Sequence, residues 1–427
     1  MKNKETIDIN ADFKACFEEM ENGTDCMFVT GKAGTGKSTL LKYFCQNSKQ
    51  KIVVLAPTGI AALNIGGQTI HSFFGFPPRP INKKEIKLRN NHKLYKSFDI
   101  LIIDEISMVR ADLVDTIDFF LRVNGKDRYK PFGGARLIMF GDLFQLPPVI
   151  STPEESYIIQ QNYESPYFFS AQVFEEYPVQ MFELREVYRQ ADRQFIRMLD
   201  AVRNGTIDYD ELETLNERCK PDFPTDNDYY IILSARNATV NEINKKRLDA
   251  LKTDEFSYLP QVSGEINIEP VDSPLKLKVG AQVMFLKNDP NRRFANGTIG
   301  KVVYLNSDEV EVEILSPDNV LLRIQVERFE WEAIKYELKE EGINARKVGT
   351  YKQFPLKTAW AMTIHKSQGK TFDRIIIDLK GGAFESGQTY VALSRCRTLE
   401  GIILKNPIQP RDIMVDPRIL DFYQMHF

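Results

Sequence analysis

The stretch Gly31-Lys32-Ala33-Gly34-Thr35-Gly36-Lys37-Ser38 decides the fold class, because it stands between an apolar run and a helical pattern. The preceding run, Cys26–Thr30, is typical of a buried strand, and Ser38–Gln46 is typical of a helix. The alternation recurs downstream, with helix-length segments such as Ala111–Arg122 between apolar runs. Those runs are Ile52–Ala56, Asp99–Ile103, Arg136–Phe140, Tyr229–Ser234, Arg374–Asp378 and Gly401–Leu404. The pattern predicts an α/β protein whose parallel sheets are covered by helices on both faces.

The 427 residues allow several domains, and the sequence pattern suggests where they divide. Between about 275 and 326, short alternating strands separated by glycines predict a small antiparallel barrel or sandwich. Because the α/β pattern returns after Pro355, this module is expected to interrupt the second α/β domain. The expected domains are 1–179, then 180–257 with 354–427, and an inserted β-barrel at 258–353. A small insertion at 76–98 is expected within the first domain.

The composition excludes several classes of protein. Hydrophobic residues make up 43% and charged residues 27%, which excludes a disordered or collagen-like chain. The net charge of −3 excludes a histone-like polycation but allows a local basic groove for nucleic acid. Five scattered cysteines without a CxxC pair argue against a disulfide framework or a thiolate zinc site. With no secretory signal and no membrane-spanning run, we expect an intracellular protein without a membrane partner, cytoplasmic and nucleoid-associated if bacterial.

The opening stretch matches the phosphate-binding pattern GxxxxGK[ST]. Its glycines let backbone N–H groups surround phosphate oxygens, Lys37 would reach the β- and γ-phosphates, and the Ser38 hydroxyl would bind Mg²⁺. The residues predicted to hold the nucleotide are Gly31, Ala33, Gly34, Thr35, Gly36, Lys37, Ser38 and Thr39. The alternative is a glycine-rich turn without a ligand. The strand before it and the helix after it favour nucleotide binding.

Two further loops follow apolar strands and carry residues suited to hydrolysis. In Ile102-Ile103-Asp104-Glu105, Asp104 would hold Mg²⁺ through water and Glu105 would polarise the attacking water. Taken alone, this acidic pair is as readily explained as a helix cap. Gln145, in the segment 141–148, should lie at the same carboxyl edge of the sheet. It is suited to orienting water or contacting the γ-phosphate, although a loop residue held by the Pro147-Pro148 turn is the alternative.

Six segments together resemble the helicase motifs of superfamily one. They are GKAGTGKST, APTGIAALNIGGQTIHSFF, IIDEISM, GDLFQLPPV, TIHKSQGKTFD and YVALSRCR, in that order. The closest resemblance is to the petite-integration-frequency (PIF) helicases of the RecD-like branch. In this chain, Pro131-Phe132-Gly133-Gly134 resembles the signature segment of that family. The resemblance extends from Gly31 to Arg397 and implies two RecA-like P-loop domains with ATP between them. It further suggests a bacterial-type minimal helicase core.

The resemblance also implies an activity and additional site residues. The protein would be a DNA helicase that depends on ATP and Mg²⁺ and acts as a monomer. It would move 5′→3′ on single-stranded DNA and unwind tailed or forked duplexes. G-quadruplex DNA and DNA–RNA hybrids are further candidate substrates. Arg189 and Arg395 resemble the arginines that reach the γ-phosphate from the second domain, although Arg185 and Arg193 lie near Arg189 and surface ion pairs are the alternative. Related helicases bind adenine with a glutamine that lies shortly before the strand of the phosphate loop. This chain has no glutamine before Cys26, and Asn10 is the candidate substitute.

A motor on a single strand needs backbone contacts and faces on which bases can stack. The predicted DNA-binding residues are Thr58, His71, Phe73, Phe74, Thr363, His365, Lys366 and Ser367. For the two adjacent phenylalanines, burial in the core is the alternative. The inserted module resembles the small Src-homology-like barrel of RecD-type helicases, and its basic loop Asn288–Asn296, with Arg292 and Arg293, is another candidate contact. The insertion at 76–98 lies where that family places a strand-separating wedge. For both segments a solvated charged surface is the alternative.

Two other function classes are compatible with parts of this pattern. One is a nucleic-acid-binding switch, in which ATP changes affinity without processive unwinding. The other is a P-loop kinase or a transporter-associated ATPase. The second-domain motif TIHKSQG and the arginine of ALSR argue against a kinase, which requires neither. Stimulation of hydrolysis by single-stranded DNA, followed by a strand-displacement assay, distinguishes the three.

Overall fold

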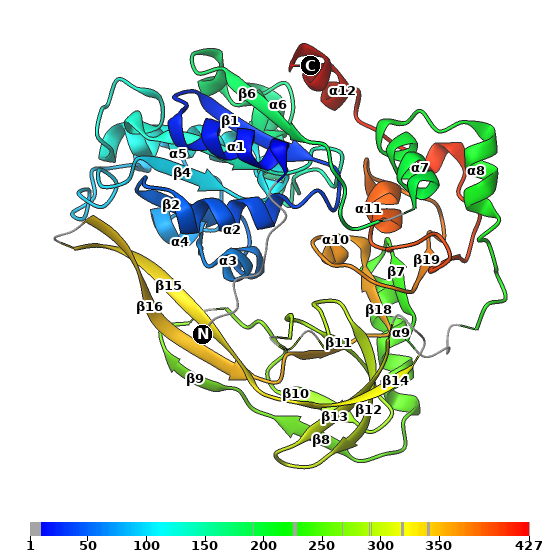
Figure 1. Cartoon of the computed structure of the whole chain (residues 1–427). Coiled ribbons are helices and arrows are strands. Elements are labelled where there is room, and N and C mark those ends of the chain that lie inside the picture. Colours follow the sequence, from blue (N-terminus) through cyan, green and yellow to red (C-terminus); the bar gives the residue numbers. More distant parts are fainter. Residues whose placement is uncertain are drawn as a thin grey trace.

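The computed structural model describes residues 10–190, 192–224, 229–266, 268–289, 291, 293–316, 320–339 and 342–426. Figure 1 shows two helix-covered parts side by side, and a β-rich part below them. A long hairpin of the β-rich part reaches up towards the first of the other two. The predicted α/β class is confirmed, because both helix-covered parts are built on parallel sheets.

The first sheet has six parallel strands in the order β3-β2-β4-β5-β1-β6. The strands are β1 (Cys26–Gly31), β2 (Ile52–Ala56), β3 (Gln68–Thr69), β4 (Ile100–Ile103), β5 (Arg136–Phe140) and β6 (Val179–Leu184). Four of them coincide with the predicted apolar runs to within a residue. The helices are α1 (Ala11–Asn22), α2 (Lys37–Asn47), α3 (Gly59–Ile65), α4 (Ile70–Phe74), α5 (Ala111–Asn124) and α6 (Pro153–Asn162).

Alternate residues of each strand face opposite sides of this sheet, and helices bury both sides. Met27 and Val29 of β1 pack with α1 and α2 in one core, while Cys26 and Phe28 of the same strand pack with α4 and α5 in another. Since parallel strands have the same direction, the loops after β1, β4 and β5 open at one edge. The phosphate loop, the acidic pair and Gln145 therefore share that edge.

The second sheet has four parallel strands in the order β18-β7-β19-β20. They are β7 (Ile231–Ser234), β18 (Ala361–Thr363), β19 (Ile375–Asp378) and β20 (Ile402–Leu404). Its helices are α7 (Arg193–Asn204), α8 (Tyr209–Asn216), α9 (Asn237–Ala250), α10 (Ile364–Ser367) and α11 (Gln388–Ser394), with α12 (Pro417–His426) at the end. One face of this sheet shares a continuous apolar core with the first domain.

The interrupting module is antiparallel, as predicted, and has a core of its own. Its strands are β8 (Glu255–Tyr258), β9 (Gln261–Gly264), β10 (Leu275–Lys278), β11 (Gln282–Phe285), β12 (Ile299–Leu305), β13 (Val310–Leu315), β14 (Leu321–Val326), β15 (Phe329–Lys339), β16 (Gly342–Gln353) and β17 (Leu356–Thr358). Strands β15 and β16 form the long hairpin of Figure 1. Tyr336 on this hairpin packs against Phe73 of the first domain, and its hydroxyl accepts a hydrogen bond from the Val54 N–H (3.0 Å).

Strand pairing moves three of the predicted domain limits. The first sheet continues past residue 179, because β6 pairs with β1 along its whole length. The module begins before residue 258 and extends past 353, because β8 pairs with β10 and β17 pairs with β11. The final helix, α12, packs on the first domain, where Phe422 stacks on Phe169 at 4.4 Å between ring centroids. Among the described residues, no helix has the length and apolarity needed to cross a membrane.

Candidate active site and nucleic-acid interface

The phosphate loop joins β1 to α2 in a conformation that depends on glycine. Gly34 and Gly36 have φ of +92° and +84°, in the left-handed region that disfavours other residues. A Cβ at Gly34 would lie 2.5 Å from the Cβ of Arg189. The missing side chain therefore lets the chain after β6 lie directly against the phosphate loop.

Lys37 points back into the curve of this loop. Its Nζ donates to the carbonyl oxygens of Gly31 and Lys32. Burial lowers the pKa of Lys37, although the negative charges of Asp142 and Glu105 act in the opposite direction. An ammonium group held in this loop is placed to bind phosphate oxygens, which supports the role predicted for it.

The acidic pair lies at the end of β4, as predicted. Glu105 has a φ of +53°, and a non-glycine residue in this region stores strain that is common at functional sites. Burial, then the neighbouring Glu105, raises the pKa of Asp104 to about 7. Burial also raises the pKa of Glu105, against the effect of Lys37. A divalent cation would stabilise the charged forms of these two carboxyl groups, of which Asp104 is buried and Glu105 half-buried.

Two arginines, Arg395 of the second domain and the half-buried Arg189 after β6, lie close to each other. Arg395, at the end of α11, is 1% exposed, and its donors meet carbonyl and hydroxyl oxygens, including Val391 O (2.9 Å) and Ser394 Oγ (2.8 Å). Burial and the nearby Arg189 lower the pKa of Arg395 to about 9. Arg189 donates to Ser394 O (3.2 Å), and burial lowers its pKa too. A surface ion pair is therefore not the role of Arg395, whose charge has no carboxylate hydrogen-bonded to it among the described residues.

These groups line a cavity of about 580 Å³, which we call the P-loop pocket. Its wall is formed by Ala33, Gly34, Thr35, Gly36, Lys37, Ser38, Thr39, Glu105, Gln145, Tyr188, Arg189, Gly369, Thr371, Arg395 and Arg397. The structure thus brings together on this wall all the predicted nucleotide and catalytic residues except Gly31 and Asp104, which do not line it. Of the three arginines considered near β6, Arg189 is the one on the wall.

Four wall residues were missed by the sequence reasoning: Tyr188, Gly369, Thr371 and Arg397. Each lies within two residues of a predicted site residue or inside a recognised motif, and this proximity was the available signal. Asn10, proposed as a substitute for the missing glutamine, donates to the Tyr188 hydroxyl (2.8 Å) and to Glu186 (2.6 Å). Its link to the P-loop pocket therefore runs through Tyr188.

Gln145 connects the two domains at the edge of this pocket. Its Nε2 donates to Asp142 Oδ2 (3.3 Å), and its Oε1 accepts from Gln368 Nε2 (3.4 Å). Asp142 belongs to the first domain and Gln368 follows α10 of the second. Gln145 is therefore held by hydrogen bonds from both domains, and not by the Pro147-Pro148 turn alone.

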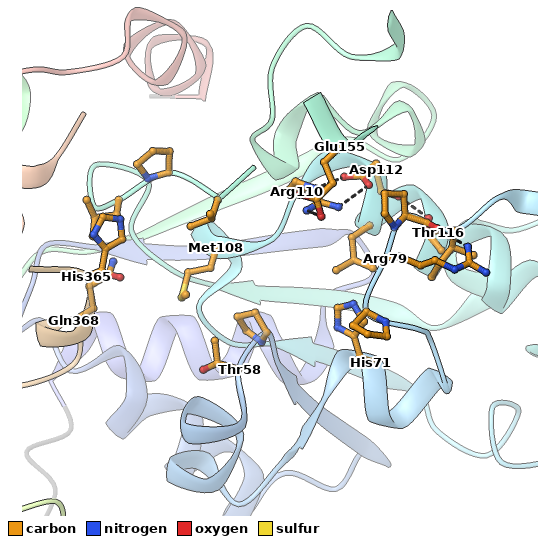
Figure 2. A pocket seen from close by; sticks show the side chains of 18 residues that line it. Thr58, His71, Arg79, Met108, Arg110, Asp112, Thr116, Glu155, His365 and Gln368 are labelled. Carbon is orange, nitrogen blue, oxygen red and sulfur yellow. Dashed lines mark hydrogen bonds and ion pairs between the residues drawn. The ribbon is translucent and has the colours of Figure 1, made fainter. Parts of the chain in front are cut away.

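A second cavity of about 320 Å³ lies next to Gln145 and is named the Thr58 pocket (Figure 2). It is lined by Pro57, Thr58, His71, Pro78, Arg79, Pro80, Ile81, Met108, Arg110, Asp112, Leu113, Thr116, Leu146, Pro147, Val149, Glu155, His365 and Gln368. His365 and Gln368 come from the second domain and approach from the opposite side to His71 and Arg110 (Figure 2). Three predicted DNA-binding residues, Thr58, His71 and His365, meet in this pocket.

The stacking role predicted for Phe73 and Phe74 is wrong. They are 5% and 0% exposed and pack with Tyr95, Phe98 and Phe120 in the core of the first domain. Their position on α4 turns both rings towards the sheet, whereas His71 is on the pocket side.

Two of the predicted second-domain contacts are also structural. The Thr363 hydroxyl caps α10 by accepting from the Lys366 N–H, and the Ser367 hydroxyl donates to Ile364 O (2.6 Å). Both side chains are buried and satisfied within the chain, which rules out the predicted DNA contact in this conformation. Lys366 is exposed but does not line the Thr58 pocket.

The two predicted basic segments differ in their relation to this pocket. In the insertion at 76–98, Pro78–Ile81 form part of the pocket wall, while Leu94, Tyr95 and Phe98 are core residues. In the loop of the module, Arg293 forms an ion pair with Asp289 (2.8 Å). Arg292 lies outside the described residues. The first segment therefore lies at the pocket, and its role as a wedge stays a prediction.

The fold and the P-loop pocket define a nucleoside triphosphatase in which two RecA-like domains share one phosphate site. A family model described as PIF1-like helicase matches residues 8–213, and a model described as DNA helicase Pif1, 2B domain matches residues 267–305. The chain belongs to the Pif1-like helicase family. It is 33% identical to ATP-dependent DNA helicase Pif1 of Bdellovibrio bacteriovorus, over 98% of this chain and 92% of that protein.

Other relatives extend the comparison. ATP-dependent DNA helicase PIF1 of Xenopus laevis is 35% identical over 93% of this chain, which spans 61% of that longer protein. Among solved structures, Bacteroides sp. Pif1 in complex with ADP-AlF4 is 39% identical and matches with a TM-score of 0.90, over 98% of this chain and 97% of that one. The same protein bound to single-stranded DNA matches with a TM-score of 0.69 over the same shares. These matches confirm the family and the two RecA-like domains.

Proposed function

We propose that this protein is an ATP-dependent DNA helicase that moves 5′→3′ along single-stranded DNA and unwinds the duplex ahead of it. One observation carries the proposal: residues of both RecA-like domains line a single P-loop pocket. A shared pocket makes hydrolysis depend on the distance between the domains, and a change in that distance is what moves a strand. The Thr58 pocket lies next to it, is formed by both domains and is the proposed binding site for the strand.

The roles of the residues follow from the geometry of the P-loop pocket. Lys37 and the loop N–H groups bind the phosphates, and Glu105 orients the attacking water with Gln145. Arg189 and Arg395 stabilise the charge that develops on the γ-phosphate, because a guanidinium in a buried site interacts strongly with it. Loss of the γ-phosphate removes the anion that holds these arginines against the first domain. Domain opening then follows hydrolysis.

Mg²⁺ is the proposed metal cofactor, with Ser38 and Asp104 as the residues that would hold it. The raised pKa of Asp104 fits this role, because a carboxyl group that is costly to ionise alone is stabilised by a bound cation. When bound, Mg²⁺ would neutralise charge on the β- and γ-phosphates.

Substitution of the two main catalytic groups tests the proposed hydrolysis. We expect Lys37→Ala to abolish ATP hydrolysis and Glu105→Gln to lower it by roughly 100-fold or more while ATP still binds. Lys14→Ala, on the exposed side of α1, is the matched control and should hydrolyse ATP normally. Full turnover by Lys37→Ala would overturn the assignment.

Polarity and the nature of the substrate are tested with tailed duplexes. We expect unwinding of a duplex with a 5′ single-stranded tail and none with a 3′ tail. Hydrolysis stimulated by single-stranded DNA without strand displacement would favour the ATP-controlled binding switch instead. Forked duplexes, G-quadruplexes and DNA–RNA hybrids are the other proposed substrates for the same assay.

The structural neighbours support a rearrangement of the domains on DNA. The chain matches the unliganded Bacteroides structure with a TM-score of 0.89 and the complex with single-stranded DNA with 0.69. We infer that the arrangement in Figure 1 is the DNA-free one. The protein is proposed to act as a monomer in the cytoplasm, close to the nucleoid in a bacterial cell, and its sedimentation with and without DNA tests the monomer.

A further inference from the structure

A buried ion pair joins the two RecA-like domains beside the P-loop pocket. Arg203, on α7 of the second domain, is 4% exposed, and Asp142, after β5 of the first, is 1% exposed. Arg203 Nη2 lies 3.3 Å from Asp142 Oδ1. Neither side chain is part of the pocket wall, and the proposed mechanism uses neither.

Asp142 is the residue that holds Gln145 from the first-domain side. Its Oδ2 accepts from Gln145 Nε2 (3.3 Å) and from the Tyr390 hydroxyl (3.4 Å), while its Oδ1 accepts from the Phe144 N–H (3.3 Å) as well as from Arg203. The orientation of this carboxylate therefore sets the position of the Gln145 amide. Arg203 occupies one of its oxygens and fixes that orientation from the second domain.

The guanidinium of Arg203 is itself fixed by aromatic rings. It lies 4.0 Å from the centroid of Phe144 and 5.6 Å from that of Tyr423 on α12. Burial lowers the pKa of Arg203, but Asp142 acts in the opposite direction together with Tyr423, Tyr390 and Glu183, and their combined effect raises that pKa. Its Nε has no hydrogen-bond partner among the described residues.

This arrangement is poorly suited to a purely stabilising role. A buried ion pair often stabilises a protein no more than apolar residues of the same volume, because desolvating the charges is costly. An unpaired buried Nε adds to that cost. The pair does, however, give Asp142 a single orientation, and a catalytic group displaced by about 1 Å loses much of its rate.

We propose that Arg203 is a positioning residue for ATP hydrolysis, which places Gln145 through Asp142 and makes its position depend on α7. A shift of α7 relative to the first domain would move Arg203, release the carboxylate and withdraw Gln145 from the γ-phosphate. The rate of hydrolysis would then depend on the position of α7 relative to the first domain. The inference rests on the ATP hydrolysis proposed above and adds a residue to it.

The test compares two arginines on the same helix. Arg197 also forms an ion pair, with Glu211 (2.9 Å), but its side chain is 75% exposed and is not part of the wall of the P-loop pocket. We expect Arg203→Met to lower the kcat of DNA-stimulated hydrolysis by roughly 10- to 100-fold, with the KM for ATP within about 3-fold of the wild type. Arg197→Met should leave both parameters unchanged.

A double-mutant cycle separates positioning from a general structural effect. If Arg203 acts through Gln145, Gln145→Ala with Arg203→Met should be no slower than Gln145→Ala alone, because both changes remove the same contribution. Losses that multiply would overturn the proposal, as would a kcat for Arg203→Met within about 2-fold of that for Arg197→Met.

Folding is controlled by a variant that keeps the charge. Arg203→Met leaves Asp142 without its counter-charge, so each variant is checked by thermal melting and by binding of a fluorescent ADP analogue. If Arg203→Met does not fold, Arg203→Lys takes its place. It keeps the charge but not the planar fork, and kcat should fall by roughly 3- to 10-fold. An unchanged kcat would overturn the proposal. If the wild-type protein hydrolyses ATP, the proposed hydrolysis stands even when the Arg203 variants contradict the positioning role. If the wild-type protein does not hydrolyse ATP, both the proposed hydrolysis and the positioning role are wrong.

Discussion

Phe74 and His71 lie on the same short helix, α4. Substitution of Phe74 tests the stability of the core, and substitution of His71 tests the binding of DNA. Phe74 is fully buried against Phe76, Tyr95 and Phe120, so Phe74→Ala leaves a cavity. We expect the free energy of unfolding in denaturant to fall by about 3–5 kcal/mol. His71→Ala, on the Thr58 pocket, should change that free energy by less than about 0.5 kcal/mol yet weaken binding of single-stranded DNA. A Phe74→Ala variant that is as stable as the wild type but binds DNA poorly would contradict the assignment of Phe74 to the core.

The sequence predicted which residues would gather at the P-loop pocket more accurately than which side chains would be exposed for DNA. The phosphate loop, Glu105 and Gln145 are set by local geometry, because each follows a strand whose direction is fixed by the parallel sheet. At Phe73, Thr363 and Ser367 the outcome depends on which side of a very short helix faces the core. Helices of four or five residues have too little periodicity to show this in the sequence. The burial of Arg395 likewise arises from contacts between segments far apart in the chain.

Gln368 carries the next prediction at the residue scale. It lines the Thr58 pocket and donates to Gln145, which lines the P-loop pocket. A strand that fills the first pocket can thus reorient the amide in the second. We expect Gln368→Ala to retain slow hydrolysis without DNA and to lose roughly 5- to 10-fold of the stimulation by single-stranded DNA, a coupling of about 1 kcal/mol. Hydrolysis rates at saturating DNA measure this, and undiminished stimulation would refute the link.

The hairpin β15–β16 is the element whose docking should control access of DNA. Since β3 pairs with only two residues of β2, the Val54 N–H depends on the Tyr336 hydroxyl. Tyr336→Phe leaves that buried donor unpaired in the docked arrangement, at a cost of about 1–3 kcal/mol. If DNA requires the hairpin to leave, affinity for single-stranded DNA should rise by roughly 5-fold or more, measured by fluorescence anisotropy.

Tyr304→Phe provides the control for this hairpin variant. Tyr304 lies on β12 of the same module and is 46% exposed, and its hydroxyl accepts a hydrogen bond from Asn306 Nδ2 (3.0 Å). It should bind DNA as the wild type does. Weaker DNA binding by Tyr336→Phe would mean that the docked hairpin helps to hold the strand. The sequence predicted that this segment belongs to the module but not that it docks on the first domain. Val54 and Tyr336 are distant in the chain, and the local sequence around one residue does not depend on that around the other.

The charge of the whole molecule predicts how its DNA affinity depends on salt. The net charge is −3, and the cations of the Thr58 pocket are already paired: Arg110 with Asp112 (2.9 Å) and Glu155 (2.7 Å), and Arg79 with Glu85 (2.8 Å). Apolar residues such as Met108 and Leu146 form much of the remaining wall. Few cations are therefore free to displace counterions from the DNA backbone, and stacking should supply much of the affinity.

We expect the logarithm of the affinity for single-stranded DNA to fall with the logarithm of salt concentration with a slope of about −1 to −2, equivalent to roughly two or three neutralised phosphates. Glu155→Gln frees part of the charge of Arg110, so the slope should steepen by about 0.7 and the affinity at low salt should rise. Glu330→Gln, which removes a partner of the exposed Lys347 on the hairpin, should leave the slope unchanged. A wild-type slope steeper than about −4 would show that a basic surface outside this pocket holds the strand.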